Sequence, residues 1–280
     1  MKVIDNIQRM AMFSKILKKE SKTIGFIPTM GYLHDGHLSL IKTAKKHTDV
    51  AVVSIFVNPK QFLPGEDLDR YPRDLKRDEE MARLAGGDVL FNPSAEDMYP
   101  DGYATYVDVE RLSNTLCGNT RPGHFKGVTT VVMKLFDIVK PDIAYFGQKD
   151  AQQSIIVKKM VEDLNMDIEI KVLPTVREKD GLAMSSRNIY LSEKERKDAL
   201  CLNQALNKAE AAVRSGERSA AKIIKIMEGI VKEKSTAKID YIEAVDIKTL
   251  SQVDTVSSGT LLALAVFIGK TRLIDNTILN

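Results

Sequence analysis

One short stretch decides the fold of this chain: PTMGYLHDGH, residues 28–37. It follows the apolar run TIGFI of residues 23–27, which is typical of a buried strand, and it precedes apolar residues at helical spacing over residues 38–44. A strand, a glycine-bearing turn and a helix are the layout that holds a phosphate at a helix N-terminus. The stretch therefore predicts a strand-turn-helix unit that binds an anion at its turn.

Two of the chain's four histidines, His34 and His37, fall in this turn with Gly36 between them. Backbone N–H groups, the helix dipole and both imidazoles would face one small volume, which suits charge that develops on a nucleotide phosphate. The pattern is the His-x-Gly-His signature of nucleotidylyl-transfer enzymes. The alternative is a surface position for His34 and a capping or lining position for His37 in the first helical turn.

Outward from this turn, short apolar runs alternate with amphipathic segments. Alternation of this kind predicts β-α-β units, hence a Rossmann-like parallel sheet whose ligands lie at the carboxyl ends of the strands. The expected strands are residues 24–27, 50–57, 89–91, 143–146 and 168–173, and the expected helices lie near residues 36–47, 73–85, 126–139 and 150–164.

The composition changes after residue 176. A polar loop over residues 177–188 is followed by a capping box, Ser192 with Glu195, that opens a long helix to about residue 214. A second helix is expected near residues 219–234, and strands at residues 239–245 and 260–268. We therefore predict an α/β fold with a Rossmann-like domain over residues 1–176 and a smaller α+β domain over residues 177–280.

The bulk properties indicate a globular, cytoplasmic protein. The net charge of +3 is too small to indicate a nucleic-acid surface, and the lysines, such as Lys15 and Lys18, are expected on solvated helix faces. The longest apolar run has eight residues, which is too short to span a bilayer, and no signal peptide is visible. Cys117 and Cys201 fit neither a metal spacing nor a disulfide framework, so reduced thiols are expected.

Polar clusters follow several of the predicted strands. Asn58 and Gln61 bracket a proline turn and can each donate and accept, which suits a small polar substrate, although an ordinary turn is the alternative. Arg121 is a candidate fork for a carboxylate, whereas His124 is expected to be structural.

The acidic segment over residues 66–78 has two interpretations. Its carboxylates, Asp78 above all, are candidates for Mg²⁺ binding, or they belong to a solvated helix start.

Two further clusters carry positive charge. Lys149 is expected at a strand-helix junction as a point charge for a phosphate, with Asp150 capping the helix and Gln153 facing the same cleft. The run SSRN of residues 185–188 offers hydroxyls and an arginine for a pyrophosphate leaving group, on a loop that can close.

Six motifs in order carry a resemblance to a known family. They are PTMG with HDGH (residues 28–37), FVNPKQF (56–62), EDLDRYPR (66–73), RPGHF (121–125), FGQKD (146–150) and DGLAMSSRN (180–188). Over its whole length the chain resembles the pantothenate synthetase (pantoate–β-alanine ligase) family. The departures, at Tyr32, Asp35, Lys60, Leu63, Cys117 and Asn119, remove no residue expected in the chemistry, and only Lys60 changes charge near the substrate.

The resemblance implies a two-step ligase. Pantoate attacks the α-phosphate of ATP to give pantoyl adenylate and pyrophosphate, and β-alanine then displaces AMP to give pantothenate. Mg²⁺ as the partner of ATP, a homodimer and a C-terminal lid over the ATP site are implied as well, and the segment over residues 58–73 is a candidate for movement or an interface.

The resemblance also implies residue roles. The catalytic residues would be His34, His37, Lys149, Ser185, Ser186 and Arg187. The ATP site would comprise Pro28, Thr29, Met30, His34, Gly36, His37, Gly147, Lys149, Asp150, Val176, Met184, Ser185, Ser186 and Arg187. Pantoate and β-alanine would contact Met30, Asn58, Gln61, Tyr71, Arg121 and Gln153, and the candidate metal ligand is Asp78.

Three other classes of protein fit less well. A simple adenylyltransferase needs no second domain and no Asn58/Gln61 pair. A truncated class I aminoacyl-tRNA synthetase needs a basic surface, which a net charge of +3 does not provide. A catalytically inactive nucleotide-binding module is expected to lose one of His34, His37, Lys149 or Arg187, and all four are present.

Overall fold

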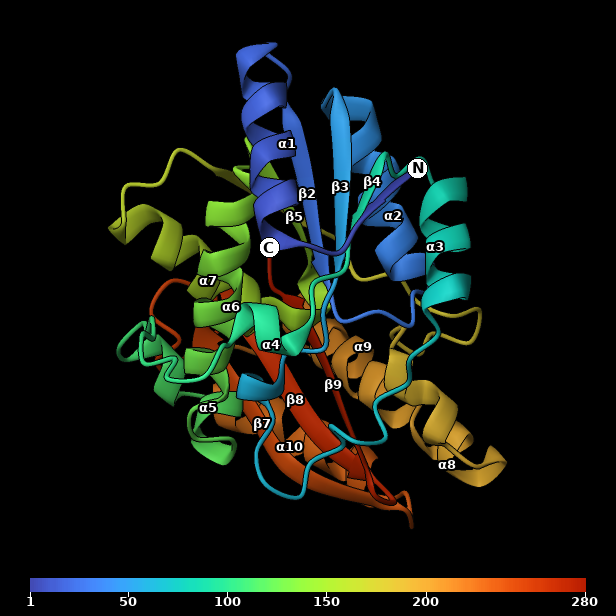
Figure 1. Cartoon of the computed structure of the whole chain (residues 1–280). Helices are drawn as coiled ribbons and strands as arrows, with labels where there is room; N and C mark the ends of the chain where they lie inside the picture. Colours follow the sequence, from blue (N-terminus) through green and yellow to red (C-terminus); the bar gives the residue numbers. More distant parts are fainter.

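A computed structural model describes residues 1–280, and its main feature is a six-stranded parallel sheet (Figure 1). The strand order is β1-β4-β3-β2-β5-β6, and every neighbouring pair is parallel. The strands are β1 (Lys2–Ile4), β2 (Ile24–Thr29), β3 (Val50–Ile55), β4 (Val89–Phe91), β5 (Ile143–Gly147) and β6 (Glu169–Leu173).

The strand order places a switch point between β2 and β5. From β2 the chain moves outward through β3 and β4, and it then returns to add β5 and β6 on the other side of β2. Ligands of open α/β sheets bind where the strand order reverses, outside the carboxyl ends of the strands. The turn after β2 and the junction after β5 are therefore neighbours at the expected position of a binding site.

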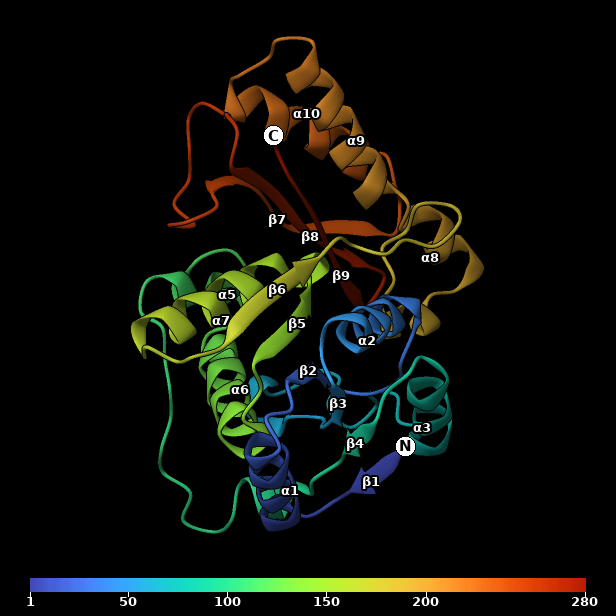
Figure 2. The ribbon, with the colours of Figure 1, turned by 90° about the horizontal axis from the view of Figure 1, so that it is seen from above.

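Helices cover both faces of this sheet (Figures 1 and 2). One face packs on α1, α6 and α7 through a core that includes Phe26 of β2 and Phe136 of α6, whose rings meet edge to face. The other face packs on α2 and α3 through residues such as Ile41 and Ala82. The helices are α1 (Ile7–Lys19), α2 (Asp35–His47), α3 (Leu75–Leu84), α6 (His124–Val139) and α7 (Ala151–Asp163), with short turns at α4 (Ala95–Met98) and α5 (Cys117–Thr120).

A second sheet, antiparallel with the order β7-β8-β9, lies above the first in Figure 2. Its outer face packs on two helices through Leu262 and Leu264 of the central strand, while Leu261 and Ala263 face the core of the parallel sheet. Burial of both faces explains why this strand reads as a continuous apolar run. The elements are α8 (Glu193–Asp198), α9 (Cys201–Arg214), α10 (Ala220–Lys232), β7 (Ala237–Asp246), β8 (Thr260–Ile268) and β9 (Thr271–Ile278).

The structure confirms the predicted α/β class, with a Rossmann-like parallel sheet and a smaller α+β part. The expected strands and helices of the first part are present within a few residues, and both cysteines are free. The domain boundary at residue 176 stays a prediction.

The long helix expected to run to about residue 214 is wrong in one respect, because it is divided into α8 and α9. Leu200 and Leu202 donate to carbonyls only three residues back, and Asp198 accepts a 2.7 Å hydrogen bond from the Thr236 hydroxyl. This bond ties the end of α8 to the segment before β7 and tightens the last turn. The capping box of Ser192 and Glu195 is present at the start of α8.

Two strands, β1 and β9, were not predicted from the sequence. β1 is only three residues long, and β9 contains Asp275 and Asn276, residue types that are rare in strands. Both side chains are almost fully buried here. A buried acid and amide in a strand indicate specific partners, which are described below.

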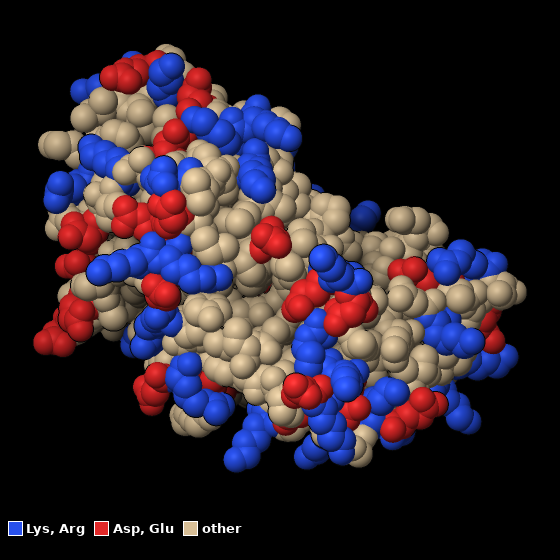
Figure 3. Space-filling model, turned by 90° about the vertical axis from the view of Figure 1, so that its right-hand side faces the viewer, with Lys and Arg blue, Asp and Glu red and all other residues tan.

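No helix is both long and apolar enough to cross a bilayer. Figure 3 shows positive and negative side chains interspersed over the face that it presents, without a region of one sign.

Candidate functional site

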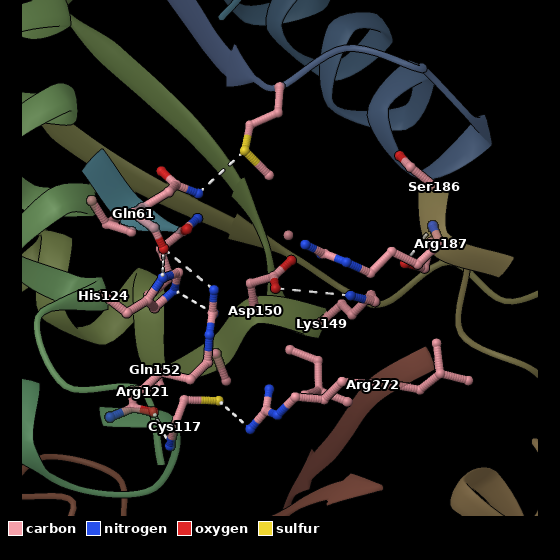
Figure 4. A pocket seen from close by; sticks show the side chains of 18 of the residues that line it. Gln61, Cys117, Arg121, His124, Lys149, Asp150, Gln152, Ser186, Arg187 and Arg272 are labelled. Carbon is pink, nitrogen blue, oxygen red and sulfur yellow. Dashed lines mark hydrogen bonds and ion pairs between the residues drawn. The ribbon is translucent and has the colours of Figure 1, made fainter. Parts of the chain in front are cut away.

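One large cavity, of about 470 Å³, lies at the switch point between the two sheets (Figure 4). It is lined by the turn after β2, the junction after β5, the segment over residues 58–71 and β9. The predicted site residues that line it are Pro28, Thr29, Met30, His34, Gly36, His37, Asn58, Gln61, Tyr71, Arg121, Gly147, Lys149, Asp150, Gln153, Val176, Met184, Ser185, Ser186 and Arg187. Asp78 is the one candidate that does not line it.

The turn between β2 and α2, here called the signature turn, is held by hydrogen bonds from its backbone to a buried carboxylate. Asp78, at the start of α3, is 1 % exposed and accepts hydrogen bonds from the backbone N–H groups of Tyr32 (2.6 Å) and Leu33 (2.7 Å). Burial raises the pKa of Asp78, and these two N–H bonds partly offset that effect. Asp78 therefore fixes the backbone that carries His34.

This position speaks against the proposed metal role of Asp78. Both of its oxygens already accept N–H groups, and Oδ1 also receives Arg77 at 3.2 Å. No group of three or more histidine, cysteine or acidic side chains is arranged to hold a metal anywhere in the chain. Asp78 acts as an anchor of the turn, which the acidic composition of the segment did not reveal.

His34 and His37 lie side by side at the start of α2, with ring centroids 4.0 Å apart. Gly36 leaves room for this arrangement, because a Cβ atom on it would lie 2.9 Å from the ring of His34 and displace it. Burial, aided by the charge of Lys149, lowers the pKa of His34 to about 4. Burial, aided by His34, lowers the pKa of His37 well below its usual value.

Both rings are therefore neutral at pH 7. The Nδ1 atom of His37 accepts the backbone N–H of His34 at 3.3 Å, so the proton of His37 belongs on Nε2. The Nδ1 atom of His34 is buried without a partner in the protein. The pair thus offers neutral hydrogen-bonding groups beside a lysine.

Gln61 is held from several sides in Figure 4. Its Nε2 atom points to the sulfur of Met30 at 3.2 Å, and its Oε1 atom accepts Nδ2 of Asn58 at 3.0 Å. Asn58 is 1 % exposed and also donates to the carbonyl of Gly127 at 3.0 Å, where α6 approaches so closely that a side chain on Gly127 would strike the backbone of Lys60. Asn58 therefore orients Gln61 more than it faces a substrate.

Arg121 is a carboxylate fork, as expected, but the carboxylate belongs to the protein. Its Nε and Nη2 atoms bind Glu66 at 2.6 and 2.7 Å, and Nη1 lies 3.0 Å from Nε2 of His124. His124 Nδ1 lies 2.7 Å from the carbonyl of Gln61, so this nitrogen donates and Nε2 accepts from Arg121. Burial, followed by Arg121, lowers the pKa of His124 to about 3, in agreement with a structural role.

Lys149 stands at the junction between β5 and α7, as the sequence predicts. Its side chain is 20 % exposed, and Nζ lies 3.8 Å from Oδ1 of Asp150. Asp150 occupies the N-cap position of α7, but its side chain makes no capping bond, so that expectation is wrong. Gln153 lies one turn into α7 and lines the cavity.

The segment over residues 185–187 closes the cavity from the C-terminal side. The hydroxyl of Ser186 donates to the carbonyl of Tyr32 at 3.1 Å, which joins it to the signature turn. Arg187 binds Asp67 through Nε (2.8 Å) and Nη2 (2.9 Å), and its guanidinium lies 5.4 Å from the ring centroid of Tyr71. Burial acts to raise the pKa of Asp67, but the bonds from Arg187 lower it on balance.

Glu66 and Asp67 are functional neighbours that the sequence reading did not identify. It took them as metal ligands or a solvated helix start, whereas each holds one of the two arginines expected to bind substrate anions. The acidic residues of this segment could have indicated that some of them pair with arginines. The sequence does not show which acid pairs with which arginine.

Comparison with known proteins shows which family the chain resembles over its whole length. The family model described as Pantoate-beta-alanine ligase matches residues 2–278. The pantothenate synthetase of Pelotomaculum thermopropionicum is 56% identical over 279 residues, covering 100% of this chain and 99% of that protein. The pantothenate synthetase of Thermotoga neapolitana is 54% identical over 279 residues, covering both chains completely.

Solved structures give the same result. The crystal structure of pantothenate synthetase from Thermus thermophilus has a TM-score of 0.94 at 42% identity and covers 99% of both chains. The pantoate-beta-alanine ligase of Francisella tularensis, described as complexed with beta-gamma ATP and beta-alanine, has a TM-score of 0.80 at 38% identity and covers 99% of this chain and 97% of that one.

Proposed function

Since the chain belongs to the pantoate-beta-alanine ligase family, we propose that it joins pantoate to β-alanine through a pantoyl adenylate, with release of pyrophosphate and AMP. The observation that carries this proposal is one cavity at the switch point, which is lined by neutral His34 and His37, by Lys149 and by the segment over residues 185–187. A carboxylate is a poor acyl donor, so adenylation supplies the leaving group that an amide bond requires.

In the first step we infer that the pantoate carboxylate attacks the α-phosphate of ATP. Negative charge grows on the phosphate oxygens, and preorganised donors in a dry site stabilise it. His34 and His37 would donate to the nucleotide phosphates, and Lys149 with Ser185, Ser186 and Arg187 would bind the β- and γ-phosphates. Gln61, oriented by Asn58, and Gln153 would hold the pantoate hydroxyl and carboxylate.

Magnesium is proposed to enter as part of the substrate, in the metal complex of ATP. The acidic residues do not form a protein cage for it, because the oxygens of Asp78 are engaged and no cluster of ligands is present. Mg²⁺ bound largely through phosphate oxygens and water is the usual arrangement for such substrates.

In the second step β-alanine would attack the adenylate carbonyl. Positioning of the amine beside the mixed anhydride accounts for most of this step in the proposal, since effective molarities of oriented reactants are large. Residues 177–280 would act as the lid over ATP, and a cytoplasmic homodimer is the proposed state of the protein.

Product analysis tests the proposal. The protein is incubated with ATP, Mg²⁺ and pantoate, with and without β-alanine. We expect pyrophosphate release that requires pantoate, and bulk AMP and pantothenate only after β-alanine is added. Nucleotide binding without turnover would contradict the ligase function.

A further inference from the structure

Asn276, on β9, reaches across to the backbone that carries Lys149. Its Nδ2 atom donates to the carbonyl oxygens of Gln148 and Lys149, both at 2.9 Å, although 127 residues separate it from Lys149. The side chain is 5 % exposed. We propose that Asn276 is a positioning residue, which fixes the direction in which Lys149 enters the cavity. This inference rests on the proposed phosphate-binding role of Lys149.

A side-chain amide fits this geometry, whereas a carboxylate or a hydroxyl of similar size does not. A side-chain NH₂ group carries two N–H bonds, one for each carbonyl, whereas a carboxylate has none and a hydroxyl has one. The Oδ1 atom of Asn276 is buried without a partner, and a flipped amide would place that oxygen against both carbonyls. The two bonds therefore decide the orientation of the side chain and explain a buried amide in a strand.

Asp275, the preceding residue of β9, is linked through Arg177 to the segment that carries Arg187. Asp275 is 2 % exposed and binds Arg177 at 2.6 and 3.0 Å, and Arg177 donates onward to the carbonyl of Gly181 at 3.2 Å. Gly181 begins the strip of chain that leads to Ser185. Neighbouring residues of one strand thus hold the segments that carry Lys149 and Arg187.

Because Lys149 is proposed to bind the phosphates of ATP, loss of these two bonds should affect ATP more than β-alanine. The turn that follows β5 lies against β9, and residues of both line the cavity. Loss of the two Asn276 bonds leaves the carbonyls of Gln148 and Lys149 without these donors, so the backbone that carries Lys149 can shift. A displacement of a binding group by about 1 Å costs on the order of 100-fold in rate.

The test compares Asn276→Asp and Asn276→Ala with Thr277→Val. Asp keeps the shape but offers no donor, and Ala removes both bonds without adding charge. Thr277 is the matched control, because its hydroxyl ties the same strand to Glu210 of α9 at 2.6 Å and does not line the cavity. ATP affinity is measured by calorimetry with Mg²⁺-ATP, and kcat and KM values are measured for ATP and for β-alanine.

We expect both Asn276 variants to weaken ATP binding and to lower kcat/KM for ATP by about tenfold to 100-fold. The KM for β-alanine and the ATP affinity of Thr277→Val should stay within about twofold of the unmodified protein. Unchanged ATP affinity in a folded Asn276 variant, or an equal loss in Thr277→Val, would overturn the inference alone. Absence of ATP binding by the unmodified protein would instead overturn the proposed function.

Discussion

The two walls of the cavity are built differently. The N-terminal wall, residues 28–37, belongs to one strand-turn-helix unit, and its backbone is supported from a distance by the carboxylate of Asp78 and the hydroxyl of Ser186. The C-terminal wall consists of Lys149 and the segment over residues 185–187, which depend on Asn276, Asp275 and Asp67. The first wall (the local wall) is therefore built mainly from one unit of sequence, while the second (the exchangeable wall) depends on long-range side-chain contacts that can be exchanged.

This difference suits the two walls to different functions in binding ATP. Buried neutral histidines on a helix N-terminus are suited to a fixed contact with the reacting phosphate. Arginine and lysine side chains whose partners come from other segments can release those partners when a polyphosphate arrives. The following changes are expected to affect one wall and not the other.

The largest effect is expected for Lys149→Ala. Loss of one preorganised cationic donor should lower kcat/KM for pyrophosphate release by about 10²-fold to 10³-fold. The melting temperature should change little, because Lys149 makes only a 3.8 Å contact with Asp150. Lys159→Ala, on the exposed side of α7, is the control for loss of a lysine. Failure of Lys149→Ala to fold would contradict a catalytic role, and the same holds for His34→Ala.

Asp78→Asn should destabilise the local wall, because it removes one of the bonds that hold the backbone of the signature turn. The N–H groups of Tyr32 and Leu33 bind different oxygens of Asp78, and an amide keeps only one oxygen in this position. A lost bond to a buried carboxylate costs about 2 kcal/mol of unfolding free energy. The free energy of unfolding, measured with denaturant, and the rate of pyrophosphate release should both be lower at every Mg²⁺ concentration. A variant with normal stability, whose activity returns at high Mg²⁺, would indicate instead that Asp78 is a metal ligand.

Asp67→Asn should affect the exchangeable wall in the opposite direction. Without its carboxylate partner, Arg187 is free to bind phosphate, so ATP affinity should increase by up to about fivefold, which corresponds to an ion pair of about 1 kcal/mol. Asp69→Asn is the control, since Asp69 is exposed and lies in the same segment. Weaker ATP binding in Asp67→Asn would show that the pair holds Arg187 in its binding position.

The smallest effect concerns protonation of His34. Its pKa of about 4 lies below the usual 6.5, so between these values the unfolded chain binds more protons than the folded one. This imidazole should therefore make the protein less stable as the pH falls from 6.5 towards 4, and it should contribute no pH dependence above 7. NMR titration of the ring checks the value, and ATP should raise the pKa because phosphate charge opposes that of Lys149. A ring that titrates near 6.5 without ligand would contradict its burial.

Much of the architecture could be predicted from the sequence. The strands around residues 24–27 and 50–57 and the helices that follow them were found because their apolar residues have a clear period. The predicted cavity residues lie together because strand ends of a parallel sheet share one edge. Strand β9 was missed because Asp275 and Asn276 interrupt its apolar pattern.

By itself, then, the sequence determined the α/β class, the signature turn with His34 and His37, and the family, since each of these depends on local spacing. Tertiary structure alone decided that Asp78 anchors the turn, that Asp67 holds Arg187 and that Asn276 holds the backbone of Lys149. The physical reason is that periodic burial leaves a pattern along the chain. A hydrogen bond between side chains and backbone far apart in sequence leaves none, because its partners are brought together only when the sheets pack.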